Sequence, residues 1–252
     1  MKYPEKSILN AFTTEKPINH NYKWLYQYHY RTSHTGPVAG VWVLNPRKNC
    51  TNPYVYFPIG VIIYGMPSAN QAGRNRFASC FLEKRTQSER LREMNRRLRT
   101  IRRVIIAPAF RGLGLATKLV RDTLPLIGTE FVESYTVSGE NCGFFQKAGM
   151  ERFSPPIRPE TTALQNGLRR LGISESLWWD SREVYNRLSG LNRKAFTEAD
   201  HLIENFLKPY KNKRGMNHSM ERIRFVLSRL SGRPTYYFWQ NTKTAENKIR
   251  AA

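Results

Sequence analysis

The fold of this chain is decided by residues 104–119, VIIAPAFRGLGLATKL. Its β-branched residues predict a strand that ends at Pro108, and a glycine-containing turn then leads directly into a helix with apolar periodicity. The first turn of such a helix has backbone N–H groups without an intrahelical acceptor, and the helix dipole favours negative charge at the same place. Gly112 and Gly114 have no Cβ, so a ligand can approach the backbone closely. The junction therefore predicts a binding site for a phosphate or pyrophosphate group.

A second strand is predicted at the distance that a βαβ unit requires. It spans residues 131–137, FVESYTV, and residues 141–150, NCGFFQKAGM, come next. The spacing Arg111-x-x-Gly114-x-Ala116 resembles the cofactor motif of the Gcn5-related N-acetyltransferase superfamily, and residues 141–150 resemble the next helix of that family. The resemblance implies an α/β (α+β) fold, in which a mixed central sheet is flanked by helices.

By the same resemblance the cofactor is acetyl-CoA or another acyl-CoA. The loop amides would hold its pyrophosphate, and an asparagine and an aromatic residue would flank its pantetheine arm. The cofactor-binding residues implied are Val104, Ile106, Arg111, Gly112, Leu113, Gly114, Leu115, Ala116, Thr117, Asn141 and Phe145.

Two other phosphate-binding folds do not fit the same stretch. A P-loop needs a Gly-Lys-Ser/Thr run after its glycines, and none follows here. A dinucleotide fold needs Gly-x-Gly-x-x-Gly, which the chain lacks, although Glu133 lies at about the right distance for a ribose-binding acid.

The charge of the chain predicts a polyanionic partner. Its 252 residues include 41 Lys and Arg but only 19 Asp and Glu, which gives a net charge of +22. Nucleic acid is the first candidate and an anionic membrane surface the second, because one coenzyme needs only a local basic patch. The hydrophobic content of 40% is enough for a core.

The cysteines and the apolar segments indicate the cellular compartment in which the protein is expected. Cys50, Cys80 and Cys142 form neither a disulfide framework nor a metal-binding pattern, so we expect a reducing compartment. The chain shows no apolar signal region and no run long enough to span a bilayer. We therefore expect a cytoplasmic protein without a membrane span, and the histidines show no spacing that specifies a metal site.

The chain divides into four predicted regions. Residues 1–21 are expected to be an irregular lead-in, and residues 22–154 the cofactor-binding core. Residues 155–240 show helical patterns and then an apolar stretch, TYYFW, that we expect to return to the sheet as a strand. Residues 241–252 are predicted to form a flexible tail.

Two basic clusters are candidates for phosphate contact. One surrounds the amphipathic helix predicted near residues 87–98, and the other accompanies Tyr210. The predicted nucleic-acid-binding residues are Arg92, Arg96, Arg97, Arg99, Lys211, Lys213 and Arg214.

A narrower resemblance concerns the acceptor. An aromatic segment containing His29 and Tyr30, the strand end at Tyr64, and Ser134 in the strand after the cofactor helix resemble the phage Mom-type DNA-modification proteins. That family has an acetyltransferase-like fold and modifies the exocyclic amine of adenine. The resemblance implies that these four residues are catalytic, while the acidic partner stays open among Glu133, Glu140 and Asp180.

The leading interpretation is an acyl-CoA-dependent transferase that modifies adenine N6 in DNA. A base in a duplex would have to leave the stack to reach a thioester, and an aromatic pocket could receive it. One alternative is an enzyme of the same fold that acts on RNA or aminoacyl-tRNA. Another is a non-catalytic nucleic-acid-binding module, and a third is acetylation of a protein, which leaves the net charge unexplained.

Overall fold

The computed structural model describes residues 8–29, 36–47, 57–71, 73–81, 86–136, 142–210, 213, 215–230, 232 and 234–241. These residues fall into two compact units. The sheet unit contains the described residues up to 136 together with 142–153 and 235–241, and the helical unit spans 154–234.

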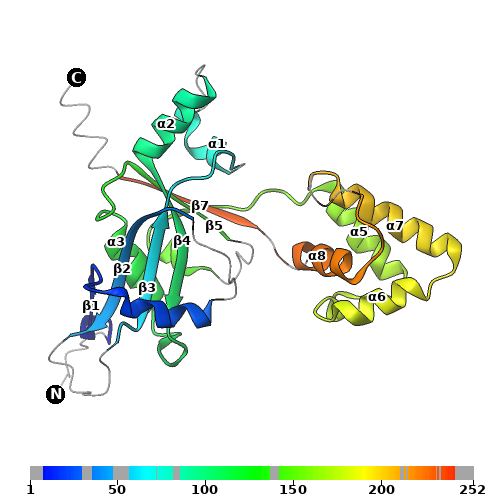
Figure 1. Cartoon of the computed structure of the whole chain (residues 1–252), viewed down its shortest axis with the longest axis horizontal. Helices are drawn as coiled ribbons and strands as arrows, with labels where there is room; N and C mark the ends of the chain where they lie inside the picture. Colours follow the sequence, from blue (N-terminus) through cyan, green and yellow to red (C-terminus); the bar gives the residue numbers. More distant parts are fainter. Residues whose placement is uncertain are drawn as a thin grey trace, which may run out of the picture. The chain divides into compact units, whose positions relative to one another are not determined.

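The sheet unit is built on one seven-stranded mixed sheet in the order β1-β2-β3-β4-β5-β7-β6 (Figure 1). Only β4 and β5 are parallel, and every other neighbouring pair is antiparallel. The strands are β1 (Phe12–Glu15), β2 (Val38–Pro46), β3 (Gly60–Gly65), β4 (Leu98–Ile106), β5 (Phe131–Thr136), β6 (Glu151–Phe153) and β7 (Thr235–Gln240). The predicted fold class, a mixed sheet flanked by helices, is confirmed.

Helices cover both faces of this sheet. On one face, here called the α3 face, α3 (Leu115–Thr123) and α4 (Phe144–Lys147) pack with side chains such as Ile62, Val132 and Tyr237. On the other, the η2 face, the 3₁₀ helix η2 (His20–Tyr28) packs on β3 and β4. The helices α1 (Arg74–Phe77), η3 (Ser79–Phe81) and α2 (Gln87–Arg97) cover the β4–β5–β7 part of that same face. Successive side chains along each strand point to opposite faces, so they belong to two separate apolar layers.

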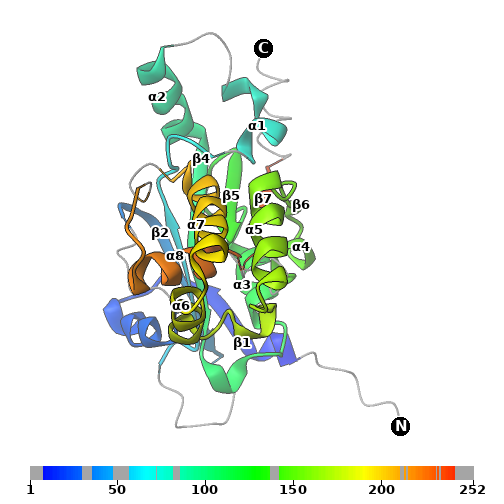
Figure 2. The same ribbon diagram turned by 90° about the vertical axis from the view of Figure 1, so that its right-hand side faces the viewer.

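The helical unit has its own core. It contains α5 (Pro159–Arg170), η6 (Glu175–Leu177), α6 (Ser181–Ser189), α7 (Arg193–Leu207) and α8 (Met220–Leu230). Figures 1 and 2 show α5 and α7 side by side, and α6 packs along α8. Apolar residues from all four α-helices fill the space between them.

The prediction for residues 1–21 was wrong. The described part of this segment contains η1 (Ile8–Ala11) and β1, which pairs antiparallel with β2 from Phe12↔Pro46 to Glu15↔Val43. Local composition gave no sign of this strand, because its pairing partner lies some thirty residues further along the chain. Residues 242–252, predicted to be a flexible tail, lie outside the described residues.

The strand predicted near residues 235–239 is confirmed. It is β7, which inserts between β5 and β6 with the register Phe131↔Gln240 and Glu151↔Phe238. The aromatic segment that precedes His29 forms the 3₁₀ helix η2, and His29 is its C-cap residue.

Candidate functional site

The two parallel strands part at their carboxyl ends. Residues Leu98–Ile101 of β4 pair with Phe131–Ser134 of β5. Within the described residues β4 then continues to Ile106 along β3, while β5 continues along β7. After Ile101, the edge of β4 that faces β5 therefore forms no backbone hydrogen bonds with β5. Carboxyl ends of parallel strands that separate in this way are where open α/β sheets bind ligands.

A β-bulge marks the point of separation. The register between β3 and β4 shifts between the pairs Ile63↔Arg103 and Tyr64↔Ile101, so Arg102 is an extra residue on β4. The pairing of β4 with β5 ends at Ile101, directly before this residue. A bulge bends its strand and increases its twist, which accounts for the divergence of β4 from β5.

The glycine turn lies beyond the carboxyl end of β4. After η4 (Pro108–Phe110), Gly112 has a φ of 84° and Gly114, the N-cap residue of α3, has a φ of 78°. Residues 111–114 are exposed, and the first bond that closes the helix runs from the Lys118 amide to the Gly114 carbonyl. The amides of the first helical turn, residues 115–117, therefore have no acceptor within the helix. The predicted anion-binding geometry is present in the backbone.

There is also room for a ligand over this turn. A Cβ built on Gly112 would meet no atom within 4 Å, and one built on Gly114 would meet only the Leu9 side chain, at 3.7 Å. Arg111 folds back and its Nε donates to the Ile106 carbonyl at 3.0 Å, which ties the turn to the end of β4. These features fit a diphosphate group held by main-chain amides.

Most of the predicted cofactor residues around the turn have side chains that pack in the core or lie on the surface away from it. The side chains of Ile106 and Leu115 are buried in the α3-face core, Val104 packs against it, and Leu113 is exposed. Ala116 and Thr117 are half-buried in the first turn of α3.

Phe145 is a correction to the predicted pantetheine contacts. Its ring is 3% exposed and packs against the ring of Tyr237, with centroids 4.8 Å apart. The aromatic core of the α3 face occupies the side chain that the resemblance assigned to the cofactor. Asn141 lies outside the described residues, and its neighbour Cys142 is half-buried, with its thiol pKa raised by burial.

Tyr64 was predicted to be catalytic, and the structure contradicts this. Its side chain is fully buried on the α3 face, where its hydroxyl lies 2.7 Å from Thr123 Oγ1. Thr123 Oγ1 donates to the Leu119 carbonyl at 2.7 Å, so Tyr64 is the donor in the pair. Burial raises the pKa of Tyr64 far above its ordinary value. This hydroxyl joins the sheet to α3 and has no route to a substrate.

Tyr64 and Ser134 lie at one level of the sheet, since both are paired with Ile101, but His29 does not join them. His29 follows η2 on the opposite face of the sheet, and its backbone N–H donates to the Tyr26 carbonyl at 3.1 Å. Ser134 is buried at the last β4–β5 pair, where its hydroxyl donates a long bond, 3.4 Å, to the Ile101 carbonyl. Tyr30 lies outside the described residues.

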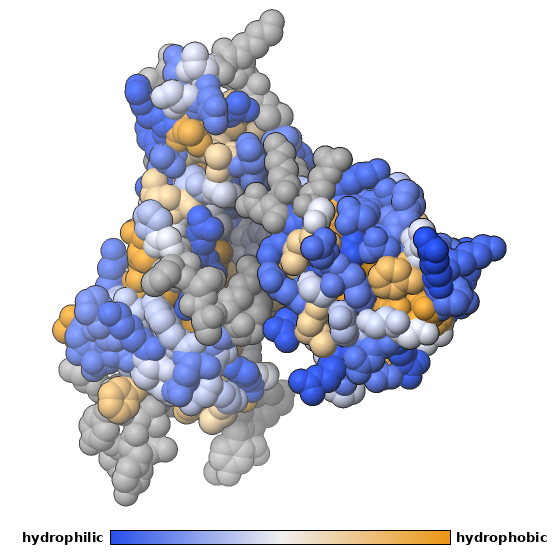
Figure 3. Space-filling model, turned by 45° about the vertical axis from the view of Figure 1, so that its right-hand side comes forward, coloured by the Kyte–Doolittle hydropathy of each residue, from blue (hydrophilic) through white to orange (hydrophobic). Residues whose placement is uncertain are grey.

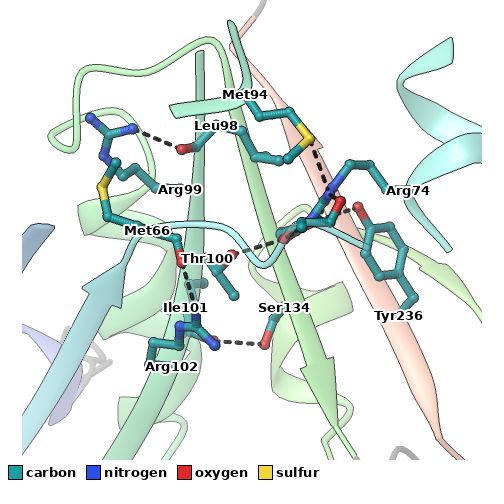
Figure 4. A network of polar contacts seen from close by, with 12 residues as sticks. Met66, Arg74, Met94, Leu98, Arg99, Thr100, Ile101, Arg102, Ser134 and Tyr236 are labelled. Atoms are coloured by element: carbon teal, nitrogen blue, oxygen red, sulfur yellow. Dashed lines mark hydrogen bonds and ion pairs between the residues drawn. The ribbon is translucent and has the colours of Figure 1, made fainter. Parts of the chain in front are cut away.

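Glu133, one of the open acidic candidates, is bonded by Arg74, Thr100 and Tyr236, and these three partners are labelled in Figure 4. Its carboxylate accepts from Arg74 Nε at 2.9 Å and Arg74 Nη2 at 2.7 Å, a bidentate pair. The hydroxyls of Thr100 and Tyr236 also donate to it, both at 2.8 Å. Glu133 and Arg74 are 2% and 3% exposed, so the network fastens α1 to the sheet and is closed to solvent. Asp180 caps α6 in the helical unit, and Glu140 lies outside the described residues.

Three residues outside the predicted site sets border the strand separation on the η2 face. Arg102 is exposed at the bulge and donates from Nη2 to the Met66 carbonyl at 2.5 Å. Arg103 is almost buried, and its guanidinium lies 5.0 Å from the Tyr26 ring centroid, a cation–π contact with η2. Tyr135 is exposed near the end of β5. The signal in the sequence was a pair of arginines inside a β-branched strand, which breaks its alternation.

The predicted basic face of α2 is only partly available to phosphate. Arg97 is a correction, because it forms a bidentate pair with Glu130 at 2.8 and 2.9 Å and also bonds Glu93. Arg96 pairs with Glu93, and Arg99 donates to the carbonyls of residues 95 and 98. Arg92 is exposed.

Of the second predicted basic cluster, near Tyr210, the structure describes one of the three predicted residues, Lys213. Lys213 pairs with Glu221 at 2.8 Å and lies over the Phe225 ring. Lys211 and Arg214 lie outside the described residues.

The chain matches no family model, and no curated protein or solved structure matches it. Over the described residues, His, Cys, Asp and Glu side chains do not gather in threes as a metal site would require. No helix within the described ranges has the length and apolar character needed to cross a bilayer.

Proposed function

We propose that this protein is an acyl-CoA-dependent transferase of the Gcn5-related N-acetyltransferase type, and that its acceptor is an amine on nucleic acid. One observation carries the cofactor half of the proposal. An exposed turn with two left-handed glycines opens a helix at the carboxyl end of two parallel strands that have separated. This arrangement presents first-turn amides and an unpaired strand edge to the same ligand.

The residues that would hold the coenzyme follow from that geometry. Amides of residues 112–117 would bind the diphosphate, and the free edge of β4 after Ile101 would bond the amide groups of the pantetheine arm. The bound coenzyme would supply a thioester, an acyl group already activated for transfer to an amine. Arg111 would keep the turn against the end of β4 through its bond to the Ile106 carbonyl.

The acceptor half rests on charge and on the η2 face. The chain has a net charge of +22, and Arg92 and Arg102 are exposed on the sheet unit. Near the strand separation the η2 face offers the aromatic residues of η2, with Arg103 against Tyr26. Aromatic rings beside a guanidinium suit a base removed from its stack. Of the nucleic acids, DNA with adenine N6 as the acceptor is the version that the Mom-type resemblance supports.

The proposal is tested with acyl-labelled acetyl-CoA. The protein is incubated with duplex DNA and, separately, with tRNA, and each is digested to nucleosides for mass spectrometry. We expect an acyl mass increment on deoxyadenosine. Label on RNA alone would reject the DNA acceptor, and label on neither would reject transfer to nucleic acid.

A matched pair of variants ties the activity to the turn. Gly112→Ala forces a Cβ onto a residue with a φ of 84°, and Gly172→Ala does the same at 75° in the helical unit. Each carries a backbone strain of about 1–2 kcal/mol, so both lose similar stability. Only Gly112→Ala should lose labelling and weaken acetyl-CoA binding in calorimetry. Equal labelling by the two variants would contradict a role for the turn.

A further inference from the structure

The helical unit contains a helix pair that the proposed transferase activity does not use. The helix α6 ends at Ser189, residues 190–192 form a turn, and α7 begins at Arg193. The turn is anchored, because Leu191 packs against the core of the unit and Asn192 caps α7 by accepting from the Ala195 amide at 3.0 Å. The two helices pack mainly on different partners, α6 on α8 and α7 on α5, so they do not lie along one another as an antiparallel hairpin would. Two helices that join through a short turn and then diverge have the form of a helix-turn-helix.

The outer face of α7 is polar and basic. Ala199, Ile203, Phe206 and Leu207 are buried, and these positions define the inner stripe of the helix. The opposite stripe is exposed and is made of Arg193, Lys194, Thr197, Glu198, His201 and Lys208. It contains three cations and one acid, and two of the cations lie in the first turn. Figure 3 shows that the helical unit presents a mostly hydrophilic surface with a smaller apolar area.

The acids of α7 are neutralised by arginines from other helices. Glu198 pairs with Arg170 of α5 at 3.0 Å. Asp200 and Glu204 both bond Arg222 of α8, whose side chain is 1% exposed. Asp200 and Glu204 stay more than a third exposed, but the buried Arg222 neutralises both carboxylates. No acidic partner of Arg193 or Lys194 is present among the described residues, so their charges remain available to an anion.

We infer that α7 is a recognition helix that enters the major groove of duplex DNA. Its first-turn cations would contact phosphates, where the helix dipole adds to their charge. Thr197 and His201, one and two turns further along the same stripe, would face the base edges, and Lys208 would contact the backbone at the far end. Because α7 belongs to the helical unit, this site is separate from the cofactor turn.

The inference is tested on the full chain by fluorescence anisotropy with a labelled duplex of about thirty base pairs, a length that exceeds one half-site. The test variant is Arg193→Gln with Lys194→Gln, which lowers the net charge by two. The matched control is Arg224→Glu, which lowers the net charge by the same amount at an exposed cation of α8. Circular dichroism checks that each variant is folded, and calorimetry with acetyl-CoA checks that the cofactor site is unchanged.

We expect the α7 variant to bind the duplex at least about tenfold more weakly than the wild type, and the control to bind within about twofold of it. The salt dependence of log K should become shallower by about 0.9 for each phosphate contact removed. His201→Ala should alter the preference among duplex sequences while leaving the salt dependence unchanged. Unaltered binding by the α7 variant, or an equal loss in the control, would overturn the inference. Tighter binding of single-stranded RNA than of duplex DNA would also overturn it.

These results are independent of the proposed activity. A variant that loses duplex binding but still binds acetyl-CoA supports α7 as the DNA contact, whether or not transfer to DNA is found. A wild-type protein that binds duplex DNA but not acetyl-CoA would leave α7 supported and refute the transferase.

Discussion

Removing the Glu133 carboxylate should destabilise the sheet unit severely. In Glu133→Ala the Arg74 guanidinium, 3% exposed, would stay buried without its partner. Breaking a buried pair from one side costs about 3–5 kcal/mol. The hydroxyls of Thr100 and Tyr236 would lose their acceptor as well, at a cost of about 1–3 kcal/mol each if it is not replaced. Since these losses are not additive, we expect the free energy of unfolding to fall by about 4 kcal/mol.

Two comparisons separate this explanation from a chemical role for Glu133. Arg74→Met with Glu133→Leu removes both charges, so only the hydroxyl terms remain, and the loss should be about half of that for Glu133→Ala. Glu93→Gln, which breaks pairs with the more exposed arginines of α2, should cost about 1 kcal/mol or less.

The assay is urea unfolding followed by hydrogen exchange of peptides from β5 and β7, because these peptides report the sheet unit alone. The reasoning would be refuted if Glu133→Ala were as stable as Glu93→Gln. It would also be refuted if the double variant lost more stability than Glu133→Ala.

Three further results are expected. Gly73→Ala should destabilise the sheet unit by about 1–3 kcal/mol in thermal unfolding, because its Cβ would lie 2.3 Å from Cγ and 2.6 Å from Cβ of the fully buried Tyr236, and a wild-type melting temperature would contradict this packing. The pKa of His218 is lowered by burial and by a nearby arginine, so its stabilising effect is complete above the unfolded pKa of about 6.5 and is lost as pH falls through the folded pKa. His218→Phe should therefore reduce the loss of helical-unit stability between about pH 7.5 and 5, and an unchanged pH profile would argue against this assignment. Tyr64→Phe removes the bond to Thr123, so we expect a stability loss of about 1 kcal/mol with acyl transfer within about threefold of wild type, whereas a loss above about a hundredfold would restore Tyr64 as a catalytic residue.

The strand, turn and helix from Val104 to Thr123 could be predicted because the residues that determine each element lie within it or next to it. β-branched residues favour the strand, Pro108 ends it, and the glycines allow a turn with positive φ before α3. The helix α2 was predictable in the same way, since Thr86 and Glu89 form a capping box at its start.

The settings of Glu133 and Tyr64 depend on contacts between residues that are distant in the sequence. Glu133 meets Arg74 across 59 positions, and Tyr64 meets Thr123 across the same separation. From sequence alone, a polar residue in a strand could be a functional side chain or could hydrogen-bond a partner inside the core. The two cases are separated only when the helix that packs on the strand is known. The bulge at Arg102 could not be predicted for a related reason. A bulge is defined by how β3 pairs with β4, and that pairing is not known from the sequence of β4 alone.

The most direct test of the cofactor site is an NMR titration of ¹⁵N-labelled protein with coenzyme A. Bound diphosphate should shift the backbone amide resonances of residues 112–117 more than those elsewhere, and S-acetylpantetheine, which lacks the diphosphate, should leave them nearly unmoved. Saturable binding with its largest shifts away from this turn, or no binding at millimolar coenzyme, would contradict the assignment of the turn as the diphosphate site.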